Sequence, residues 1–412
     1  MQKVIVIGGG AAGLMAAVTA AQNGAEVLLL EKNDRLGKKL LITGKGRCNV
    51  TNTAVLQDFV KNIPGNGRFL YSVFSQFFNW DTWSFFEELN VPLKEERGGR
   101  VFPVSDKAAD IVNAFADLLR SLAVQIKYNE NVSEIKTENG KAVGVITAKG
   151  DIFTADSIIL ATGGASYPGT GSNGDGFKIA QRLGHHIVEL HPALVPLECE
   201  EDWIKDWQGL SLRNVNVKVI VDGRDEREMF GEMLFTHFGI SGPIILSLSR
   251  QIALDLKAGK TVELSINLKP ALTREQLDKR ICRDFEKYSR KQIKNALGDL
   301  LPSKMIEDII DLAFIDGEKF VNQISREERE RLVDLLQNLI VTITRTRPLS
   351  EAIVTGGGIS TKEINPKTME SKLISGLYCI GEVVDVDAFT GGYNLQAAFS
   401  MGYAAGVDCV KK

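Results

Sequence analysis

Three glycines near the N-terminus have the spacing that binds the pyrophosphate of a dinucleotide. The segment "VIVIGGGAAG" carries Gly8, Gly10 and Gly13 between an apolar run typical of a buried strand and an alanine-rich run typical of a helix. The first glycine permits a tight turn, the second lets the backbone approach a pyrophosphate, and the third permits close packing of helix on strand. A second apolar run ends at Glu31, where a carboxylate can accept a hydrogen bond from a ribose hydroxyl. With Lys32 next, the pattern offers no arginine pocket for a 2′-phosphate and predicts FAD or NAD as the resident nucleotide.

A second match to the same glycine pattern does not predict a second nucleotide domain. The segment "GTGSNG", residues 169–174, follows "SYP" rather than a strand, and no acid closes another βαβ unit. This segment is therefore interpreted as a loop. With a single fingerprint, the chain is expected to hold FAD, and NADH or NADPH would bind only transiently as a co-substrate.

The C-terminal segment "AFTGGYNLQAAF" predicts a second ligand-binding turn. Gly391 and Gly392 precede a helix that begins near Tyr393, Asn394 and Leu395. The N–H groups and the positive end of this helix would face the ring end of the cofactor, where a reduced flavin carries negative charge. Two strand ends, "ATGG" and "YCIGEVVD", suit an extended cofactor that lies across the carboxyl ends of one sheet. The nucleotide domain is therefore expected to contain both ends of the chain.

Most of the remaining candidates for cofactor binding lie in or beside these turns and in one long loop, and Val132 lies in a predicted strand between them. That loop follows the first βαβ unit and is rich in Gly, Lys, Arg and Asn, and loops of this length inside compact domains are usually functional. Beyond the glycines, the acid and the helix start above, the residues expected at the cofactor are Ala12, Lys32, Lys39, Gly44, Arg47, Asn49, Val132, Ala161, Thr162, Gly163, Gly381, Glu382 and Asp387.

The composition predicts a folded protein of several domains without a metal centre. The chain has 412 residues, 44% of them apolar, and a formal net charge of −3. No run approaches the ~20 apolar residues of a membrane span. The five cysteines form no CxxC pair and only four histidines are present, so neither a zinc site nor a disulfide framework is expected. We therefore expect a cytoplasmic protein with reduced thiols and no membrane contact, and the oligomeric state is not predicted.

Six blocks of the sequence resemble the BaiN/RdsA family of flavoproteins, the YhiN-type NAD(P)/FAD-dependent oxidoreductases. In chain order they are "GGGAAGLMAA", "GKKLLITGKGRCNVTN", "FPVSDKAADIV", "ATGGASYPGTGSNGDGF", "GEMLFTHFGISGP" and "GEVVDVDAFTGGYNLQAAFSMG". The resemblance implies an α/β fold with a discontinuous Rossmann-like FAD-binding domain (1–194 and 348–412), a β-barrel-like insertion (195–270 and 339–347) and a helical insertion (271–338). It also implies an enzyme that reduces carbon–carbon double bonds, either of uridine in large-subunit ribosomal RNA or of a bile-acid intermediate.

Reduction of an activated double bond requires a proton donor beside the hydride source, and two side chains are candidates. Cys48 lies in the loop "GRCNVTN" and His237 in the loop "LFTHFGISGP". Each also has a structural interpretation, because a lone cysteine in such a loop is commonly a packing residue and a histidine a hydrogen-bonded one. His185 and His186 follow the end of a predicted helix, where histidine complements the helix C-terminus.

A cluster of basic residues in the helical insertion is the candidate contact for ribosomal RNA. On a helix, three-to-four spacing would place these residues on one face: Arg280, Arg283, Lys287, Arg290, Lys291 and Lys294. Such a face can contact phosphates, although a run of charges is more often a solvated surface. Three functions stay open: an FAD reductase of uridine in ribosomal RNA, an FAD reductase of a small unsaturated metabolite, and a non-enzymatic flavoprotein that senses redox state or assists ribosome assembly.

Overall fold

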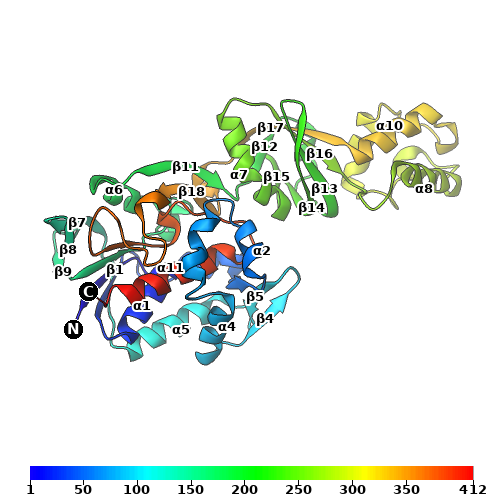
Figure 1. The fold of residues 1–412 in the computed structure, drawn as a ribbon. Helices are drawn as coiled ribbons and strands as arrows, with labels where there is room; N and C mark the ends of the chain where they lie inside the picture. The colour runs from blue at the N-terminus through cyan, green and yellow to red at the C-terminus, as the bar shows by residue number, and fades with distance from the viewer. Residues whose placement is uncertain (412) are drawn as a thin grey trace. The chain divides into compact units, whose positions relative to one another are not determined.

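The computed structural model describes residues 1–411, which fall into two compact units (Figure 1). Unit 1 contains residues 1–193 and the C-terminal residues from 349 onward, and unit 2 contains Leu194–Pro348. The chain therefore leaves unit 1 once and returns to it. Among the described residues, no helix is long and apolar enough to cross a membrane. Nor do three or more His, Cys, Asp or Glu side chains of residues 1–411 group together where they could hold a metal ion.

Unit 1 is built on a parallel sheet of five strands in the order β19-β10-β1-β2-β6. The strands are β1 (Lys3–Ile7), β2 (Glu26–Glu31), β6 (Gln125–Tyr128), β10 (Ser157–Leu160) and β19 (Leu377–Cys379). The central strands are apolar because both faces of a parallel sheet are covered. Ile5 of β1, for example, is 2% exposed and lies between Ile158 and Leu28 of the neighbouring strands. Because β19 comes from the C-terminal part of the chain and pairs with β10, the expected discontinuous Rossmann-like α/β fold is confirmed.

Helices α1 (Ala11–Gln22) and α11 (Tyr393–Asp408) pack side by side in unit 1 (Figure 1). Both are rich in small residues, so their backbones come close together. A Cβ atom added at Gly402 would lie only 2.4 Å from the carbonyl oxygen of Ala12. The last helix of the chain is thus held directly against the first helix.

Smaller sheets and helices complete unit 1. Three strands form the sheet β3-β5-β4, three form β7-β8-β9, and β11 pairs antiparallel with β18. These strands are β3 (Thr51–Asn52), β4 (Leu93–Glu96), β5 (Arg100–Pro103), β7 (Val132–Glu138), β8 (Lys141–Thr147), β9 (Ile152–Thr154), β11 (Ile187–Ala193) and β18 (Val354–Ile359). The helices are α2 (Leu56–Lys61), α3 (Tyr71–Phe74), α4 (Asn79–Glu88), α5 (Ala108–Ser121) and α6 (Asp175–Arg182), with the 3₁₀ turns η1 (Leu40–Gly46) and η10 (Gly381–Val383).

Aromatic side chains join α11 to the helices of the N-terminal part of unit 1. Phe86 of α4 packs edge-on against Phe115 of α5 and Phe399 of α11, with ring centroids 5.5 and 5.8 Å apart. All three rings are fully buried. Aromatic pairs of this geometry contribute about 0.5–1.5 kcal/mol beyond the area they bury. They fix α11 at a second place along its length.

Unit 2 contains a closed barrel of six strands in the order β12-β15-β14-β13-β16-β17. The strands are β12 (Leu197–Cys199), β13 (Ser211–Val221), β14 (Arg224–Thr236), β15 (Gly239–Ser241), β16 (Val262–Asn267) and β17 (Leu339–Thr346). Every second residue of β13 from Val215 to Val221 is buried, because successive side chains of a strand point to opposite faces. Helix α7 (Pro243–Lys257) packs on β14 and buries Ile244 and Ile245.

Three helices lie between β16 and β17 in the chain: α8 (Arg274–Lys287), α9 (Ile306–Leu312) and α10 (Arg326–Gln337). The N-cap residues of α8 and α10 are Thr273 and Ser325, whose hydroxyls each accept a 3.2 Å hydrogen bond from a backbone N–H three residues on. The apolar faces of these helices, with Leu277 and Leu332, are buried in the same core as the barrel strands. The expected barrel and helical insertion are therefore both present and share one core.

Candidate cofactor-binding site

The turn between β1 and α1 has the shape that the glycine spacing predicts. Gly8 has a φ of 104°, and a Cβ atom there would lie 2.5 Å from the carbonyl oxygen of Ala161. A Cβ atom at Gly13 would lie 1.9 Å from the carbonyl oxygen of Gly8, so only glycine lets α1 pack on β1. At Gly10, in contrast, a Cβ atom would meet nothing within 4 Å. The second glycine therefore borders open space, as the approach of a pyrophosphate to the backbone requires.

The N-terminus of α1 can bind an anion in this space. Gly10 is the N-cap residue, and no side chain caps the helix there. The first N–H groups of a helix have no partner within the helix, and they carry the positive end of its dipole. Together with the open space at Gly10, these groups fit the pyrophosphate of FAD.

Glu31 at the end of β2 holds the glycine turn through its carboxylate. Its Oε2 atom accepts a 2.7 Å hydrogen bond from the N–H of Gly9, and Oε1 accepts from the N–H and the side-chain amide of Asn33 at 2.8 and 2.7 Å. The side chain is buried, being 6% exposed. Each carboxylate oxygen can accept more than one hydrogen bond, so capacity remains for a ribose hydroxyl. Asn33 had no signal of its own in the sequence.

The loop "GTGSNG" lies beside this nucleotide-binding turn. Asn33 donates a 3.1 Å hydrogen bond to the carbonyl oxygen of Thr170, and the ammonium of Lys32 contacts Asn173 at 2.6 Å and Asp175 at 3.2 Å. Lys32 is thus paired with the start of α6. The second glycine pattern therefore belongs to a loop that lines the first one.

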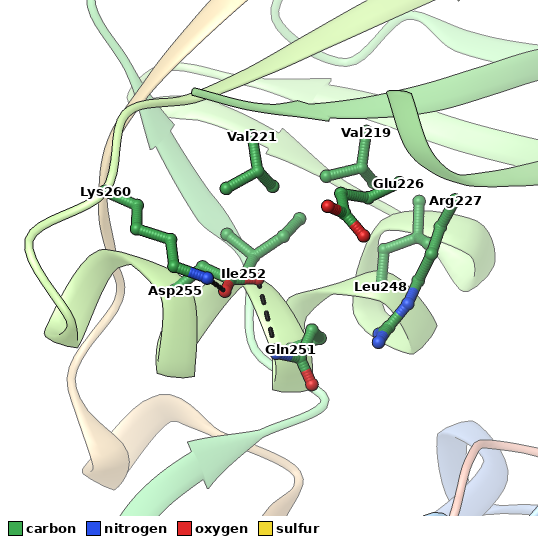
Figure 2. Close-up of a pocket in the computed structure, with 9 residues that line it drawn as sticks. All are labelled: Val219, Val221, Glu226, Arg227, Leu248, Gln251, Ile252, Asp255 and Lys260. Atoms are coloured by element: carbon green, nitrogen blue, oxygen red, sulfur yellow. Dashed lines mark hydrogen bonds and ion pairs between the residues drawn. The ribbon is translucent and has the colours of Figure 1, made fainter. Parts of the chain in front are cut away.

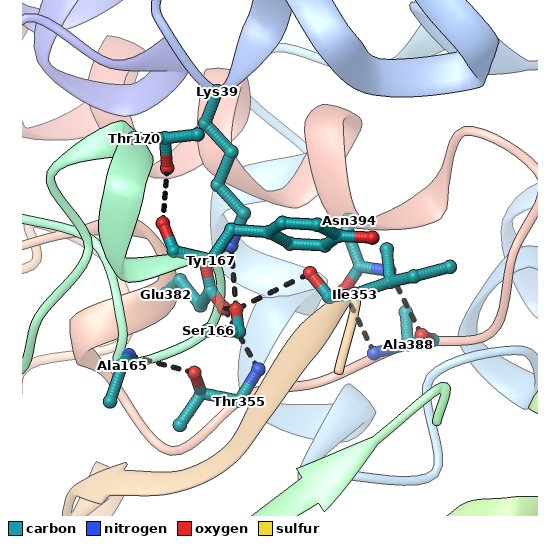
Figure 3. A network of polar contacts seen from close by, with 10 residues as sticks. All are labelled: Lys39, Ala165, Ser166, Tyr167, Thr170, Ile353, Thr355, Glu382, Ala388 and Asn394. Atoms are coloured by element: carbon teal, nitrogen blue, oxygen red, sulfur yellow. Dashed lines mark hydrogen bonds and ion pairs between the residues drawn. The ribbon is translucent and has the colours of Figure 1, made fainter. Parts of the chain in front are cut away.

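A part-buried ion-pair network joins segments that are distant in sequence (Figure 3). The ammonium of Lys39 donates to Ser166 Oγ and to Glu382 Oε2, both at 2.7 Å. Ser166 in turn donates to Glu382 Oε1 at 2.9 Å, and the N–H of Thr355 in β18 donates to the same oxygen at 2.8 Å. The hydroxyl of Thr355 accepts a 2.8 Å hydrogen bond from the N–H of Ala165. Neither Ser166 nor Thr355 was recognisable from the sequence.

The charge of Glu382 is stabilised by this network. Burial alone would raise the pKa of its carboxyl, but the Lys39 ammonium, the Thr355 N–H and the Ser166 hydroxyl hold the pKa below its ordinary value. The two charged side chains are only 23% and 19% exposed, so solvent screens the pair weakly. Glu382 is therefore an ionised, fixed acceptor at the end of the sheet.

Two further contacts place Glu382 beside the glycine turn. A Cβ atom at Gly381, which has a φ of 74°, would lie 2.9 Å from the Cβ atom of Ala12 in the first turn of α1. The segment after β10 lies opposite, since a Cβ atom at Gly164 would be 2.9 Å from the carboxyl carbon of Glu382. The ends of β1, β10 and β19 thus converge, as binding across the carboxyl ends of a sheet requires.

Two buried polar atoms in this region have no hydrogen-bond partner among the described residues. They are Oγ1 of Thr162, directly after β10, and Oδ1 of Asn49 in the long loop. An unpaired buried polar atom costs about 1–3 kcal/mol. Both residues were expected at the cofactor, and a bound FAD could satisfy such atoms. Gly163 follows Thr162 with a φ of 74°, and Val132 is buried at the start of β7.

The N-terminus of α11 is fixed against the long loop. Gly391 and Gly392 have φ of 127° and 98°, and a Cβ atom at Gly392 would lie 2.2 Å from the carbonyl oxygen of Thr51. Asn52 donates a 3.0 Å hydrogen bond to the carbonyl oxygen of Gly391. No side chain caps this helix, so its first N–H groups stay available to a ligand. This end of α11 has the arrangement expected for the ring end of a flavin.

Several side chains expected at the cofactor are engaged in the protein instead. The side-chain amide of Asn394 accepts a 3.0 Å hydrogen bond from the N–H of Ala388 and donates a 2.9 Å hydrogen bond to its carbonyl oxygen. The ring of Tyr393 packs edge-on against Phe59, with ring centroids 4.7 Å apart. Leu395 is partly buried and Asp387 fully buried. At this helix start, the backbone rather than these side chains is therefore free to contact a ligand.

Arg47 is turned toward the sheet β3-β5-β4. Its guanidinium pairs with Glu96 and with Asp106 and stacks over the ring of Phe102 at 4.1 Å. Gly44, in the same loop, has a φ of 56°, and its Cβ atom would lie 3.1 Å from the N–H nitrogen of Asn49. Arg47 therefore holds the loop in place through these contacts.

The two candidate proton donors lie in different units. Cys48 is fully buried in the core of unit 1, and burial raises the pKa of its thiol to about 12, a rise that a hydrogen bond with Thr43 limits. His237 is exposed in unit 2, between β14 and β15, where its ring packs edge-on against Phe238 at 5.0 Å. The contacts of these two side chains give neither of them a catalytic role.

The other histidines differ in their surroundings. The ring of buried His185 is bonded on both sides, to Glu363 at 2.9 Å and Ser371 at 3.0 Å, so it is a structural residue. His186 is exposed. His191 in β11 was not singled out from the sequence, yet its Nε2 atom is buried without a hydrogen-bond partner among residues 1–411.

The expectation that all six basic residues share one helix face is wrong. Helix α8 ends at Lys287, with Tyr288 as C-cap, so Arg290, Lys291 and Lys294 lie beyond it. Three of the six cations are also paired with carboxylates: Arg280 with Asp284 (2.9 Å), Lys287 with Asp299 (2.7 Å) and Lys294 with Glu318. In the described part of the chain, Arg283, Arg290 and Lys291 form no ion pair and are exposed.

A cavity of about 110 Å³ in unit 2 contains no residue expected at the cofactor (Figure 2). Its lining includes the apolar side chains of Val219 and Ile252 and the charged side chains of Glu226, Arg227, Asp255 and Lys260. Asp255 accepts from Lys260 at 2.8 Å and from Gln251 at 3.3 Å.

The chain is similar to known proteins over almost its whole length. The model of the HI0933-like protein Rossmann domain matches residues 2–408. The chain is 34% identical to the 3-dehydro-bile acid delta(4,6)-reductase of Clostridium scindens, over 98% of each protein. It is 31% identical to the ribosomal RNA dihydrouridine synthase of Haemophilus influenzae, over 98% of this chain and 97% of that protein. The solved structure of 3-ketosteroid delta1-dehydrogenase from Sterolibacterium denitrificans is similar in fold, with a TM-score of 0.50 over 98% of this chain and 99% of that one at 13% identity.

Substitution of Gly10 should separate cofactor binding from folding. Because a Cβ atom at Gly10 meets no atom of residues 1–411 within 4 Å, Gly10→Val is expected to fold normally but to block the pyrophosphate. Purified protein should be colourless, with a melting temperature close to that of wild-type apoprotein. Gly13→Val is the matched comparison, since its side chain would overlap the Gly8 carbonyl and should lower the melting temperature as well. Yellow Gly10→Val protein with full FAD content would contradict the assignment.

Removal of the Lys39 ammonium should destabilise unit 1 in a pH-dependent way. Lys39→Met leaves the Glu382 carboxylate without its cation, which we expect to cost about 1–3 kcal/mol at pH 7. In the wild type, the lowered pKa of Glu382 contributes stability above the unfolded pKa, and this is lost as pH falls. In the variant, burial raises the pKa, so protonation relieves the penalty in acid. The difference in unfolding free energy should therefore shrink from pH 7 to pH 4, as measured by urea unfolding.

The control for this prediction is the double variant Lys39→Met with Glu382→Gln. It replaces both charges by neutral groups of similar shape and should be more stable than Lys39→Met alone at pH 7. An equal difference from wild type at every pH would show that the charge of Glu382 is not what Lys39 stabilises.

Proposed function

The chain belongs to the HI0933-like Rossmann family and is an FAD-dependent oxidoreductase, and we propose that it reduces a carbon–carbon double bond with hydride from NADH or NADPH. We propose further that the double bond is that of uridine in large-subunit ribosomal RNA, which becomes dihydrouridine. One observation carries the proposal: two relatives with different substrates, a delta(4,6)-reductase and a dihydrouridine synthase, align with the chain from end to end. Both names describe the addition of hydrogen to a carbon–carbon double bond.

The residues of unit 1 would hold the cofactor along the strand ends. On this proposal the N-terminus of α1 binds the pyrophosphate and Glu31 accepts a hydrogen bond from the ribose. Glu382 accepts a hydrogen bond from the ribityl chain, which joins the pyrophosphate to the flavin ring. The N-terminus of α11 stabilises negative charge at the pyrimidine end of the ring. When bound and reduced by NADH or NADPH, FAD would supply the hydride that one carbon of the double bond receives.

The second carbon of the double bond requires a proton, for which His237 and Cys48 stay the proposed donors. His237 is exposed and could exchange protons with solvent. Cys48 is fully buried, and its raised pKa keeps the thiol protonated at neutral pH. Accessibility therefore favours His237 of the two.

The electron donor is proposed to bind transiently. The nucleotide turn at Gly8, Gly10 and Gly13 would be occupied by FAD, and the other glycine pattern is a loop beside it. NADH or NADPH would then approach the flavin without a Rossmann domain of its own. We propose no preference between the two nucleotides.

Exposed cations on unit 2 support an RNA substrate. Arg283, Arg290 and Lys291 form no ion pair among residues 1–411, so their charges are available to phosphates. Lys291 also lies over the ring of Tyr288 at 4.6 Å. We propose these three residues, rather than the original six, as a phosphate contact.

A small unsaturated metabolite is the second candidate substrate. The relative named as a bile-acid reductase shares 34% identity with this chain, slightly more than the 31% of the dihydrouridine synthase. On this alternative, the site would take an enone without nucleic acid, and the three exposed cations would be solvated surface.

The first test of the proposed substrate is the nucleoside content of ribosomal RNA. Large-subunit RNA from a strain that lacks the gene should contain less dihydrouridine than RNA from its parent, as measured by mass spectrometry. A plasmid copy should restore dihydrouridine, and the Gly10→Val variant should not. Equal dihydrouridine in deletion strain and parent would reject the ribosomal RNA substrate and favour the small metabolite.

Charge reversal should test the proposed phosphate contact. Changing Arg283, Arg290 and Lys291 together to Glu is expected to weaken binding of a ribosomal RNA fragment more than about tenfold and to flatten its salt dependence. Flavin content should stay unchanged. The matched control reverses three cations on the surface of unit 1, Lys61, Arg120 and Lys149, for the same change of net charge. Equal loss in both variants would show a general effect of net charge rather than a local contact.

A further inference from the structure

His191 carries a buried nitrogen atom that lacks the partner its chemistry requires. It lies on β11, directly opposite Gly356 of β18 in the antiparallel pair. The Nδ1 atom faces the carbonyl oxygen of Glu189 at 3.3 Å, whereas Nε2 is buried and has no hydrogen-bond partner among residues 1–411. A buried, unpaired polar atom is costly, so in a native protein it points to an absent ligand or water.

The contact with Glu189 determines what that ligand must offer. A carbonyl oxygen only accepts hydrogen bonds, so Nδ1 must be the donor in this contact and carries a proton. In neutral imidazole the other nitrogen then has a lone pair and no hydrogen. Nε2 is therefore an acceptor, and its missing partner is a hydrogen-bond donor.

The glycines of β18 make room for the imidazole at this place. A Cβ atom at Gly356 would lie 2.3 Å from His191 Nε2, and one at Gly357 would lie 2.4 Å from the carbonyl oxygen of Glu189. Gly357 also has a φ of 84°. An irregularity in the pairing between Val188 and His191 accompanies this arrangement, and such bulges commonly re-aim a side chain. The approach of His191 thus explains Gly356 of the run "TGGG", and the approach of the Glu189 backbone explains Gly357.

The position of His191 relates it to the cofactor site of unit 1. Gly356 directly follows Thr355, whose N–H donates to Glu382 and whose hydroxyl accepts from Ala165. Gly356, which lies against the unpaired nitrogen, is therefore the sequence neighbour of a residue in the network that fixes Glu382.

We propose that Nε2 of His191 accepts a hydrogen bond from the imide N–H of a pyrimidine-2,4-dione ring. An imide N–H lies between two carbonyl groups and is a strong hydrogen-bond donor. It can therefore donate to the lone pair of Nε2. Two molecules in the proposed function carry this group: the ring end of FAD and the uracil base of the substrate. The inference rests on that proposed function for the identity of both.

The experiment compares His191→Phe with wild type in two binding measurements. The first titrates apoprotein with FAD and with FAD methylated at the imide nitrogen. The second follows the flavin absorbance of FAD-loaded protein while a short RNA with uridine, or with N3-methyluridine, is added. Loss of one buried hydrogen bond should weaken one of these interactions roughly tenfold. His191→Gln, which offers an acceptor oxygen, should restore part of the loss.

Each outcome assigns or removes the role. Weaker binding of FAD but not of its methylated form identifies the flavin as the source of the N–H. Unchanged FAD binding with lost discrimination between uridine and N3-methyluridine identifies the substrate. Unchanged affinity for FAD, together with unchanged or absent RNA binding, overturns the proposal.

Controls separate this contact from folding and from the proposed function. His186→Phe changes an exposed imidazole that directly precedes β11, and it should leave both measurements unchanged. If His191→Phe melts at a lower temperature, the Gln variant still reports on the acceptor, because it keeps a polar group at the site. The FAD titration uses no RNA, so it can succeed even if dihydrouridine in cellular RNA shows that the proposed substrate is wrong.

Discussion

Contact of α1 with other backbone on two sides is the constraint on which the cofactor site depends. On one side, Gly13 comes so close to the carbonyl oxygen of Gly8 that no side chain fits between them. On the other side, Gly402 of α11 approaches the carbonyl oxygen of Ala12 in the same way. Interiors this tightly packed transmit small changes of volume to their neighbours. The start of α1 is thereby fixed in front of the strand ends, and α11 brings the other end of the chain to it.

The site then relies on two carboxylates that are stabilised differently. Glu31 forms no ion pair within the described part of the chain and is held by N–H donors of Gly9 and Asn33. Glu382 has both an ammonium, from Lys39, and neutral donors around it. Hydrogen bonds to ionised groups are stronger than those between neutral groups, so both carboxylates are rigid acceptors before any ligand binds. Because the carboxylates are already fixed, less conformational entropy is lost when a ligand binds.

The departures from the sequence-based expectations have local physical causes. The basic residues of unit 2 do not share one helix, because α8 ends at Lys287 and nearby carboxylates neutralise half of the cations. Arg47 stacks on Phe102 rather than standing free in its loop. The expected side chains at the start of α11 are used within the protein, as Asn394 shows by bonding Ala388. In each case a partner distant in sequence competes for a side chain whose type had suggested a ligand.

The sequence by itself determined the nucleotide turn and the helix start at Gly391 and Gly392. These two features depend on steric limits and hydrogen-bond periods that act over a few residues, so spacing alone predicts them. The α/β fold was implied by the resemblance of six sequence blocks to a known family. Only the tertiary structure decided that Lys39 pairs with Glu382, 343 residues away, and that Gly356 accommodates the ring of His191. Such pairs depend on which strands lie side by side after folding. No local pattern encodes that choice, because it is made by the packing of the whole unit.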